Sequence, residues 1–458
     1  MSRSFPSPGL LACVVAAILG WGSGDAAAQP APPRAKFEPP DGCYIGAYVA
    51  LDDASGGDMT QFERLTAKKH ASYFRYAGYG QPFPSNWVAE VKAAGAVPHI
   101  AWEPNDGLAP VKDDAYLRQW AADARDAGCP IFLRYASEMN GNWQAYSGNP
   151  RLYIEKWRLV HKVMSEVAPN VAMVWCPFAE PVSTIDAYYP GDAYVDWVGV
   201  NIYSVWVHDN DPTKPGGEDP LQFLDPIYLR YADRKPVQIC EYAATHFCLA
   251  TKQTLSDFAT EKMTRMYQML RTKYPRVKMI NWFSVDTARK GLASNDYAVT
   301  SDPAVLERYR ALIADGHFLS NVVTGPVVVV SRPSPGKLPG RPEDEPEPMW
   351  RNPLKYIGPQ PDTGVNLIVR GSGHTGLTGK VDLLTDVGKN VRADLAMFRV
   401  DGEVVMVTTV QPFRCIWDTT TCKPGDHAVE VTLYARGMRE AARRQITLTV
   451  SHPDEKQK

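Results

Sequence analysis

Short apolar runs alternate with amphipathic stretches along the first two thirds of the chain. Between the runs, apolar residues recur with helical spacing, as at Leu117, Trp120 and Ala124, which lie between a capping Asp114 and Gly128. Eight runs are typical of buried β-strands: residues 43–50, 73–80, 97–104, 131–138, 171–178, 195–204, 236–243 and 278–286. Such strand–helix alternation over roughly 280 residues predicts an α/β fold of the (β/α)8, or TIM, barrel type rather than an open sheet.

The spacing of apolar residues changes to period two from about residue 355. An Asp401-Gly402 pair is typical of a tight hairpin turn between two of the runs. The predicted strands are residues 365–369, 379–384, 391–400, 404–410, 413–418, 427–434 and 445–450. Short strands of this kind predict a small all-β domain of the immunoglobulin-like sandwich type over residues 355–451.

Composition divides the chain into further segments. Residues 1–28 have a charged start, a short apolar run and a small-residue cleavage site, which predicts an export signal. A proline-rich leader follows at 29–40, the barrel domain covers 41–320, and a linker rich in proline and charge covers 331–350. The mature protein is therefore expected to be secreted or periplasmic, with no membrane span.

Charge and cysteine usage exclude several classes of function. The net charge of −2 provides no basic surface for nucleic acid or for an anionic membrane. No CxxC motif is present and the histidines are scattered, so a metal site is not expected. Export permits disulfides, and the sequence predicts a bridge between Cys415 and Cys422, with Cys240 and Cys248 as a second candidate pair.

Two of the predicted strands end on a glutamate. Glu138 ends the fourth strand and is followed by Asn140 and Trp143, whereas Glu241 ends the seventh. Carboxyl ends of the strands meet at one rim of a (β/α)8 barrel. A pair of carboxylates at such a rim is what glycoside hydrolysis requires. The competing interpretation is structural, with Glu138 capping a turn and Trp143 packing.

Four motifs resemble glycoside hydrolase family 26, best known for β-mannanases: residues 101–104 (AWEP), Arg134 with residues 138–143 (EMNGNW), residues 188–200, and residues 239–241 (ICE). The resemblance implies a retaining barrel enzyme that needs no cofactor, with Glu138 as acid/base and Glu241 as nucleophile. It also implies that a tyrosine, Tyr203, bonds the nucleophile. The candidate substrate-binding residues are Trp102, Glu103, Arg134, Asn140, Trp143, Asn201, Tyr203 and Trp282.

Two positions depart from the family pattern. Ser137 stands where a histidine usually precedes the acid, and Asn201 stands where an aspartate is usual. The predicted function is a secreted, retaining endo-β-glycosidase acting on a β-linked polysaccharide of the mannan or glucan type. Its two catalytic carboxyl groups are expected to lie about 5–5.5 Å apart.

Two alternatives belong to other classes. The first is a carbohydrate-binding protein that kept the barrel and lost turnover, and the second is a surface scaffold displayed through the sandwich. Retention of both glutamates favours the enzyme. The sandwich is expected to fold independently, to contact cell-surface or matrix polysaccharide, and to be dispensable for hydrolysis of short substrates.

Overall fold

A computed structural model describes residues 34–288, 291, 294–323, 364–372, 376–388, 391–409, 413–435 and 439–451. These residues all belong to one compact unit, Arg34–Lys458. The predicted signal segment, the first residues of the leader and the predicted linker lie outside the described residues.

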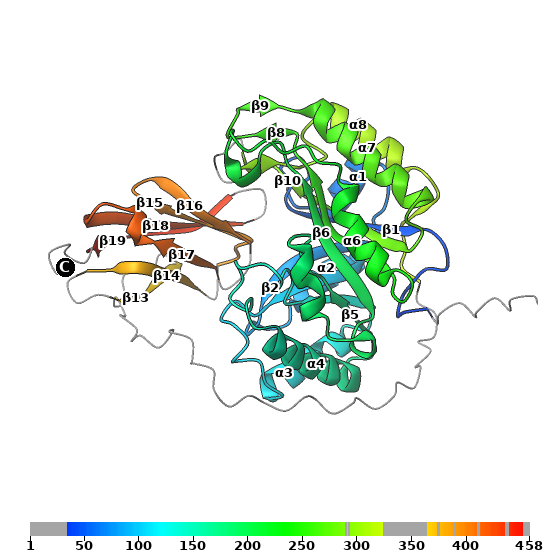
Figure 1. Cartoon of the computed structure of the whole chain (residues 1–458), viewed down its shortest axis with the longest axis horizontal. Helices are drawn as coiled ribbons and strands as arrows, with labels where there is room; N and C mark the ends of the chain where they lie inside the picture. The colour runs from blue at the N-terminus through cyan, green and yellow to red at the C-terminus, as the bar shows by residue number, and fades with distance from the viewer. Residues whose placement is uncertain are drawn as a thin grey trace, which may run out of the picture. The chain divides into compact units, whose positions relative to one another are not determined.

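The first part of the described chain is a closed parallel barrel (Figure 1). Its strands follow chain order around the ring, and β10 pairs with both β7 and β1 to close it. The strands are β1 Cys43–Leu51, β2 Ser72–Gly78, β3 Val97–Glu103, β4 Ile131–Tyr135, β5 Val171–Trp175, β6 Trp197–Ser204, β7 Val237–Ala244 and β10 Val277–Val285. The (β/α)8 prediction is therefore confirmed.

Helices cover the outside of this barrel, with α3 beside α4 and α7 beside α8 (Figure 1). Polar caps begin several of them. The side chains of Asp114 and Asn149 accept hydrogen bonds from the backbone of Leu117 and Leu152, at 3.0 Å in each case. The helices are α1 Met59–Thr66, α2 Ser85–Ala93, α3 Ala115–Asp126, α4 Pro150–Val167, α5 Val182–Ile185, α6 Leu221–Tyr231, α7 Ser256–Thr272 and α8 Pro303–Ile313.

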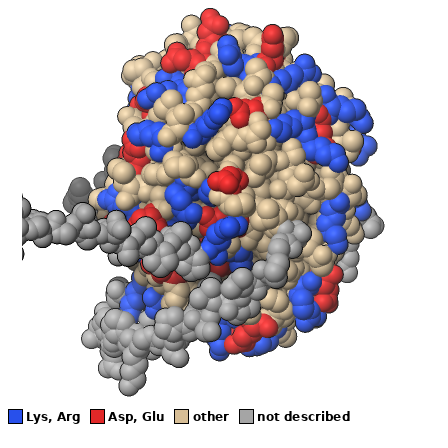
Figure 2. All heavy atoms as spheres, turned by 90° about the vertical axis from the view of Figure 1, so that its right-hand side faces the viewer, with Lys and Arg blue, Asp and Glu red and all other residues tan. Residues whose placement is uncertain are grey.

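Short elements decorate the loops. The two-residue strands β8 Phe247–Cys248, β9 Gln253–Thr254 and β11 Asn295–Asp296 form a small antiparallel sheet, and β12 Phe318–Leu319 pairs with β1. Within the described residues, no helix combines the length and the apolar character that a membrane crossing needs. Acidic and basic side chains are interspersed over the face in Figure 2, in keeping with the small net charge.

The C-terminal part is an all-β domain built from a three-stranded and a four-stranded antiparallel sheet. One sheet has the order β13-β14-β17 and the other β16-β15-β18-β19. The strands are β13 Val365–Ser372, β14 Thr378–Val387, β15 Leu395–Val400, β16 Glu403–Thr408, β17 Arg414–Asp418, β18 Gly425–Ala435 and β19 Arg439–Val450. Asp401 and Gly402 turn the β15–β16 hairpin with φ of 52° and 88°, as predicted.

The predicted disulfides are absent. Among the described residues, Cys415, Cys422, Cys240 and Cys248 are free thiols. Cys415 is buried in the apolar core of the sandwich, opposite Leu383 on β14, whereas Cys422 comes after a 3₁₀ turn, Thr419–Thr421. Proximity in sequence therefore suggested a bridge that the structure does not form.

Candidate active site

Glu138 and Glu241 lie at the same end of the barrel. Glu241 is in the last half of β7, in register with Asn201 on β6. Glu138 comes three residues after β4, and its side chain accepts a hydrogen bond from the Asn201 amide at 2.7 Å. One asparagine side chain therefore reaches from the strand beside Glu241 to Glu138.

The Glu241 carboxylate is buried among hydrogen-bond donors. The Tyr76 hydroxyl donates to Oε1 at 2.6 Å, the Arg134 guanidinium donates to the same oxygen, and the Tyr203 hydroxyl donates to Oε2. Arg134 is itself fully buried and forms an ion pair with Glu241. These contacts fix both carboxylate oxygens in place, and a carboxylate held in this way can act as a nucleophile.

The surroundings of Glu138 shift its pKa. Burial of the carboxyl group and the negative charge of Glu241 raise the pKa of Glu138 to about 7. Asn201, the charge of Arg134 and the Trp143 indole, which donates at 3.2 Å, oppose this rise in pKa. A carboxyl group that remains protonated near neutral pH can serve as a general acid.

Arg134 and Asn201 join the two carboxylates. Arg134 donates to the side-chain oxygen of Asn201 at 3.0 Å as well as to Glu241, while the Asn201 amide donates to Glu138. Both linking side chains are buried. They therefore position the glutamates: both Nη atoms of Arg134 and both polar atoms of the Asn201 amide bond to protein, whereas Nε of Arg134 is buried without a hydrogen bond.

A second buried network holds the segment that precedes Glu138. The Glu103 carboxylate accepts hydrogen bonds from the Ser137 backbone at 3.0 Å, from the Ser137 hydroxyl, and from the Tyr146 hydroxyl at 2.6 Å. Ala136 and Glu138 on either side of Ser137 have positive φ angles of 47° and 58°. Left-handed backbone at residues other than glycine costs free energy and persists only where neighbouring contacts hold it. By bonding Ser137, Glu103 holds this stretch of backbone and thereby positions Glu138.

The predicted substrate-binding residues divide into three groups. Glu103, Arg134, Asn140 and Asn201 are buried and bonded to protein; Asn140, for example, exchanges hydrogen bonds with the Phe178 backbone at 2.8 and 3.0 Å. In contrast, Trp143 is 51% exposed beside Glu138. Tyr203 is partly exposed and bonds Glu241.

The third group of predicted substrate-binding residues, Trp102 and Trp282, packs outside the barrel. The Trp102 indole is fully buried and stacks on Trp120 of α3 at a centroid distance of 4.1 Å. Trp282 is also fully buried; its ring packs among tyrosines, and its indole N–H donates to the Tyr297 carbonyl at 2.7 Å. Neither indole has a free face for a sugar, so this part of the prediction is corrected.

Sequence reasoning missed Tyr76 and Tyr48, and it placed Arg134 among the residues that bind substrate, whereas the Arg134 guanidinium bonds Glu241. Strand alternation provides a signal for Tyr76. Phe74 and Tyr76 are two residues apart on β2, and both rings lie beside the Arg134 guanidinium inside the barrel. An inward-facing tyrosine near the carboxyl end of a barrel strand is therefore a candidate active-site residue, and Tyr76 could have been found in this way.

Comparison with known proteins extends the resemblance. Residues 112–213, which include Glu138, match the model of glycosyl hydrolase family 26. Endoglucanase H of Acetivibrio thermocellus is 25% identical over 299 residues, which is 60% of this chain and 31% of that protein. The β-1,3-xylanase TXYA of a Vibrio species is 33% identical over 119 residues, 24% of this chain and 25% of that protein. The chain thus spans about a third or less of these relatives.

Solved structures with a similar arrangement include a modular endo-β-1,4-mannanase from Cellulomonas fimi, at 16% identity and a TM-score of 0.46, covering 90% of this chain and 94% of that one. A family 26 β-mannanase from Bacteroides ovatus aligns at 14% identity and a TM-score of 0.44, over 61% of this chain and 90% of that one. The segment from residue 112 to residue 213 matches glycosyl hydrolase family 26, and this confirms the resemblance that the motifs predicted.

Proposed function

We propose that the protein is a glycoside hydrolase that cleaves β-linked polysaccharide with retention of anomeric configuration. The observation that carries the proposal is the contrast between two neighbouring glutamates. Arg134, Tyr76 and Tyr203 donate hydrogen bonds to the Glu241 carboxylate, whereas burial and the charge of Glu241 raise the pKa of Glu138 to about 7. Environments that separate the protonation states of two carboxyl groups are typical of an acid and nucleophile pair.

In the proposed reaction, Glu241 attacks the anomeric carbon while Glu138 gives its proton to the oxygen of the leaving sugar. The bond from Glu241 to carbon forms as the glycosidic bond breaks. Glu138, now ionised, then takes a proton from water, which attacks the same carbon and releases Glu241. Loss of the Glu241 charge in the first step lowers the pKa of Glu138, which helps it to give up its proton.

The substrate class is proposed from the printed activities of the relatives. They are named as an endoglucanase, β-1,3-xylanases and endo-β-1,4-mannanases. The two residues that depart from the family pattern both bond to protein next to the acid: Ser137 bonds Glu103, and Asn201 bonds Glu138 and Arg134. These contacts do not select one of the three sugars. We therefore propose a β-linked glucan, xylan or mannan as substrate for a secreted or periplasmic enzyme.

A polysaccharide panel tests this function. The wild-type protein and Glu241→Gln are incubated with mannan, mixed-linkage glucan, β-1,3-xylan and bacterial exopolysaccharides, and proton NMR follows the anomeric form of the first product. We expect reducing ends with retained configuration from the wild type alone. An inverted first product would overturn the nucleophile assignment. Polysaccharide binding without turnover would favour the non-catalytic alternative.

A further inference from the structure

One face of the sandwich is apolar where an independent domain would be polar. On β15, Ala396 and Phe398 belong to the core of the sandwich, so the alternating residues Leu395 and Met397 face the other way. Nevertheless, Leu395 is 1% exposed and Met397 is 0% exposed. Their burial requires a second packing partner outside the sandwich core.

That partner is the barrel. Leu395 and Met397 belong to one buried cluster with four barrel residues, Tyr48, Leu51, Phe74 and Val285. A separate contact supports the same arrangement: Arg414 of β17 pairs with Asp382 and also donates to the Asn105 carbonyl in the loop after β3. The sandwich is thus fixed to strands β1, β2 and β10 by apolar packing and to the β3 loop by Arg414.

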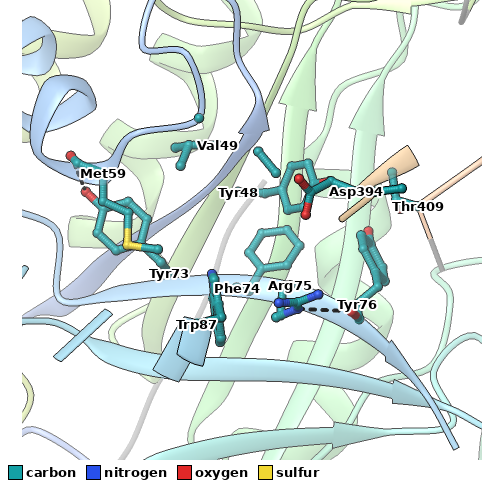
Figure 3. A pocket seen from close by; sticks show the side chains of 13 residues that line it. Tyr48, Val49, Met59, Tyr73, Phe74, Arg75, Tyr76, Trp87, Asp394 and Thr409 are labelled. Carbon is teal, nitrogen blue, oxygen red and sulfur yellow. Dashed lines mark hydrogen bonds between the residues drawn. The ribbon is translucent and has the colours of Figure 1, made fainter. Parts of the chain in front are cut away.

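Only the Tyr76 side chain separates Tyr48, a member of this cluster, from Glu241. Tyr48 stacks on Phe283 at 5.0 Å and contacts the Tyr76 ring at 5.8 Å, and the Tyr76 hydroxyl bonds Glu241. A pocket beside these rings is lined by Arg75 from the barrel and by Ala393, Asp394 and Thr409 from the sandwich (Figure 3). The burial of Tyr48 and the neighbouring Asp394 charge both raise the pKa of the Tyr48 hydroxyl.

The position of the acid indicates which end of a bound polysaccharide would reach this pocket. Glu138 and Trp143 follow β4, and the leaving sugar must lie at the acid. In the ring order of the strands, β10, β1 and β2 lie opposite β4, β5 and β6. The glycone side of the substrate therefore extends from Glu241 toward Tyr48 and the sandwich.

We propose, on the basis of the function proposed above, that the sandwich closes the glycone end of the active site. Its Asp394 and Thr409 receive the hydroxyls of the sugar at the non-reducing end of the substrate. A chain that ends against this wall can be cut only at a fixed distance from its non-reducing end. The enzyme therefore releases short products of one length, which replaces the endo action predicted from the sequence.

Undocking the sandwich tests the proposal. The probes are hexasaccharides of β-1,4-mannan, β-1,4-glucan and β-1,3-xylan labelled at the reducing end, and the one that the wild type cleaves is used further. The variant Leu395→Asp with Met397→Asp places two carboxylates in the buried cluster, and small-angle scattering verifies that the domains separate. Val404→Asp, at a residue of β16 that is 39% exposed, is the matched control.

We expect the wild type and the control to give one labelled product size at early times, and the undocked variant to give several. The same single size from the undocked variant, or several sizes from the wild type, would overturn the proposal. Absence of cleavage of every probe by the wild type would instead count against the proposed function.

A second variant addresses the contacts themselves without disturbing the packing. Asp394→Ala with Thr409→Ala removes two hydrogen-bonding side chains, and kcat/KM on the cleaved hexasaccharide should fall roughly tenfold, the loss expected from one or two hydrogen bonds. An unchanged kcat/KM together with an unchanged product size would contradict a role for these residues in sugar binding.

Discussion

At the scale of single residues, the pKa of Glu138 controls the pH dependence of the proposed reaction. Because Glu138 must be protonated to act as an acid, kcat/KM should fall as the pH rises through about 7. Asn201 donates to the Glu138 carboxylate and thereby stabilises its ionised form. Asn201→Ala should therefore raise the pKa of Glu138 and move the alkaline limb of the pH profile to higher pH.

The control is Asn170→Ala, because the Asn170 amide bonds the Ala124 and Cys129 carbonyls, next to the start of β5 and away from the glutamates. Its alkaline limb should stay where the wild type has it. A limb that moves to lower pH in Asn201→Ala would show that Asn201 does not favour the ionised acid.

Glu103 is expected to affect the rate through the position of Glu138. In Glu103→Gln, one carboxylate oxygen becomes an amide nitrogen facing the donors of Ser137 and Tyr146. We expect kcat to fall roughly tenfold to a hundredfold on substrates with poor leaving groups, a loss of about 1.4–2.7 kcal/mol of transition-state stabilisation. Substrates with good leaving groups should be nearly spared because they need little protonation, and steady-state kinetics on aryl glycosides of graded leaving-group pKa measures the difference.

The sequence predicted the location of the site better than the roles of its residues. Strand ends are readable from apolar runs, and this placed both glutamates at one rim. Successive side chains of a barrel strand point alternately inward and outward. The sequence analysis did not assign which residues of each strand point inward. Asn281 contacts His99 inside the barrel and Phe283 contacts Tyr203, so the intervening Trp282 faces outward.

At the scale of the elements, this outward position gives a prediction that separates packing from binding. Trp282→Ala should lower the free energy of unfolding by about 3–5 kcal/mol, because it leaves a cavity at a fully buried position beside the rings of Tyr242 and Tyr309. Trp143→Ala should change stability by less than about 0.5 kcal/mol, since Trp143 is largely exposed. Instead, it should raise KM. Urea denaturation followed by kinetics measures both, and a purely kinetic effect of Trp282→Ala would contradict its packing role.

Element boundaries were least predictable where the backbone is irregular. The fourth strand was expected to continue to residue 138, but β4 ends at Tyr135 because Ala136 and Glu138 adopt positive φ angles. Alanine and glutamate carry no signal for that conformation. The two-residue strands β8, β9 and β11 are too short for any apolar period to indicate them.

At the scale of the whole molecule, the sandwich was predicted from period-two spacing, but its packing on the barrel was not. A signal was present: residues 395–400 (LAMFRV) are nearly continuously apolar, and such runs indicate strands buried on both faces. The identity of the second partner depends on the shape of the assembled barrel rim, which no local pattern specifies. The expectation of a dispensable, independent domain followed from the linker alone.

The apolar cluster shared by the barrel and the sandwich predicts that the two domains unfold cooperatively. Leu395 and Met397 together contribute about 3–6 kcal/mol of apolar burial, and they also cover Tyr48 and Phe74. Barrel and sandwich should therefore unfold in one calorimetric transition, because separating them exposes this cluster. In Leu395→Asp with Met397→Asp, the transition should split into two, with the barrel transition at lower temperature than in the wild type. Val404→Asp should keep a single transition. Two transitions in the wild type would mean that the interface contributes too little to couple the domains, and would support the independent sandwich expected from the linker.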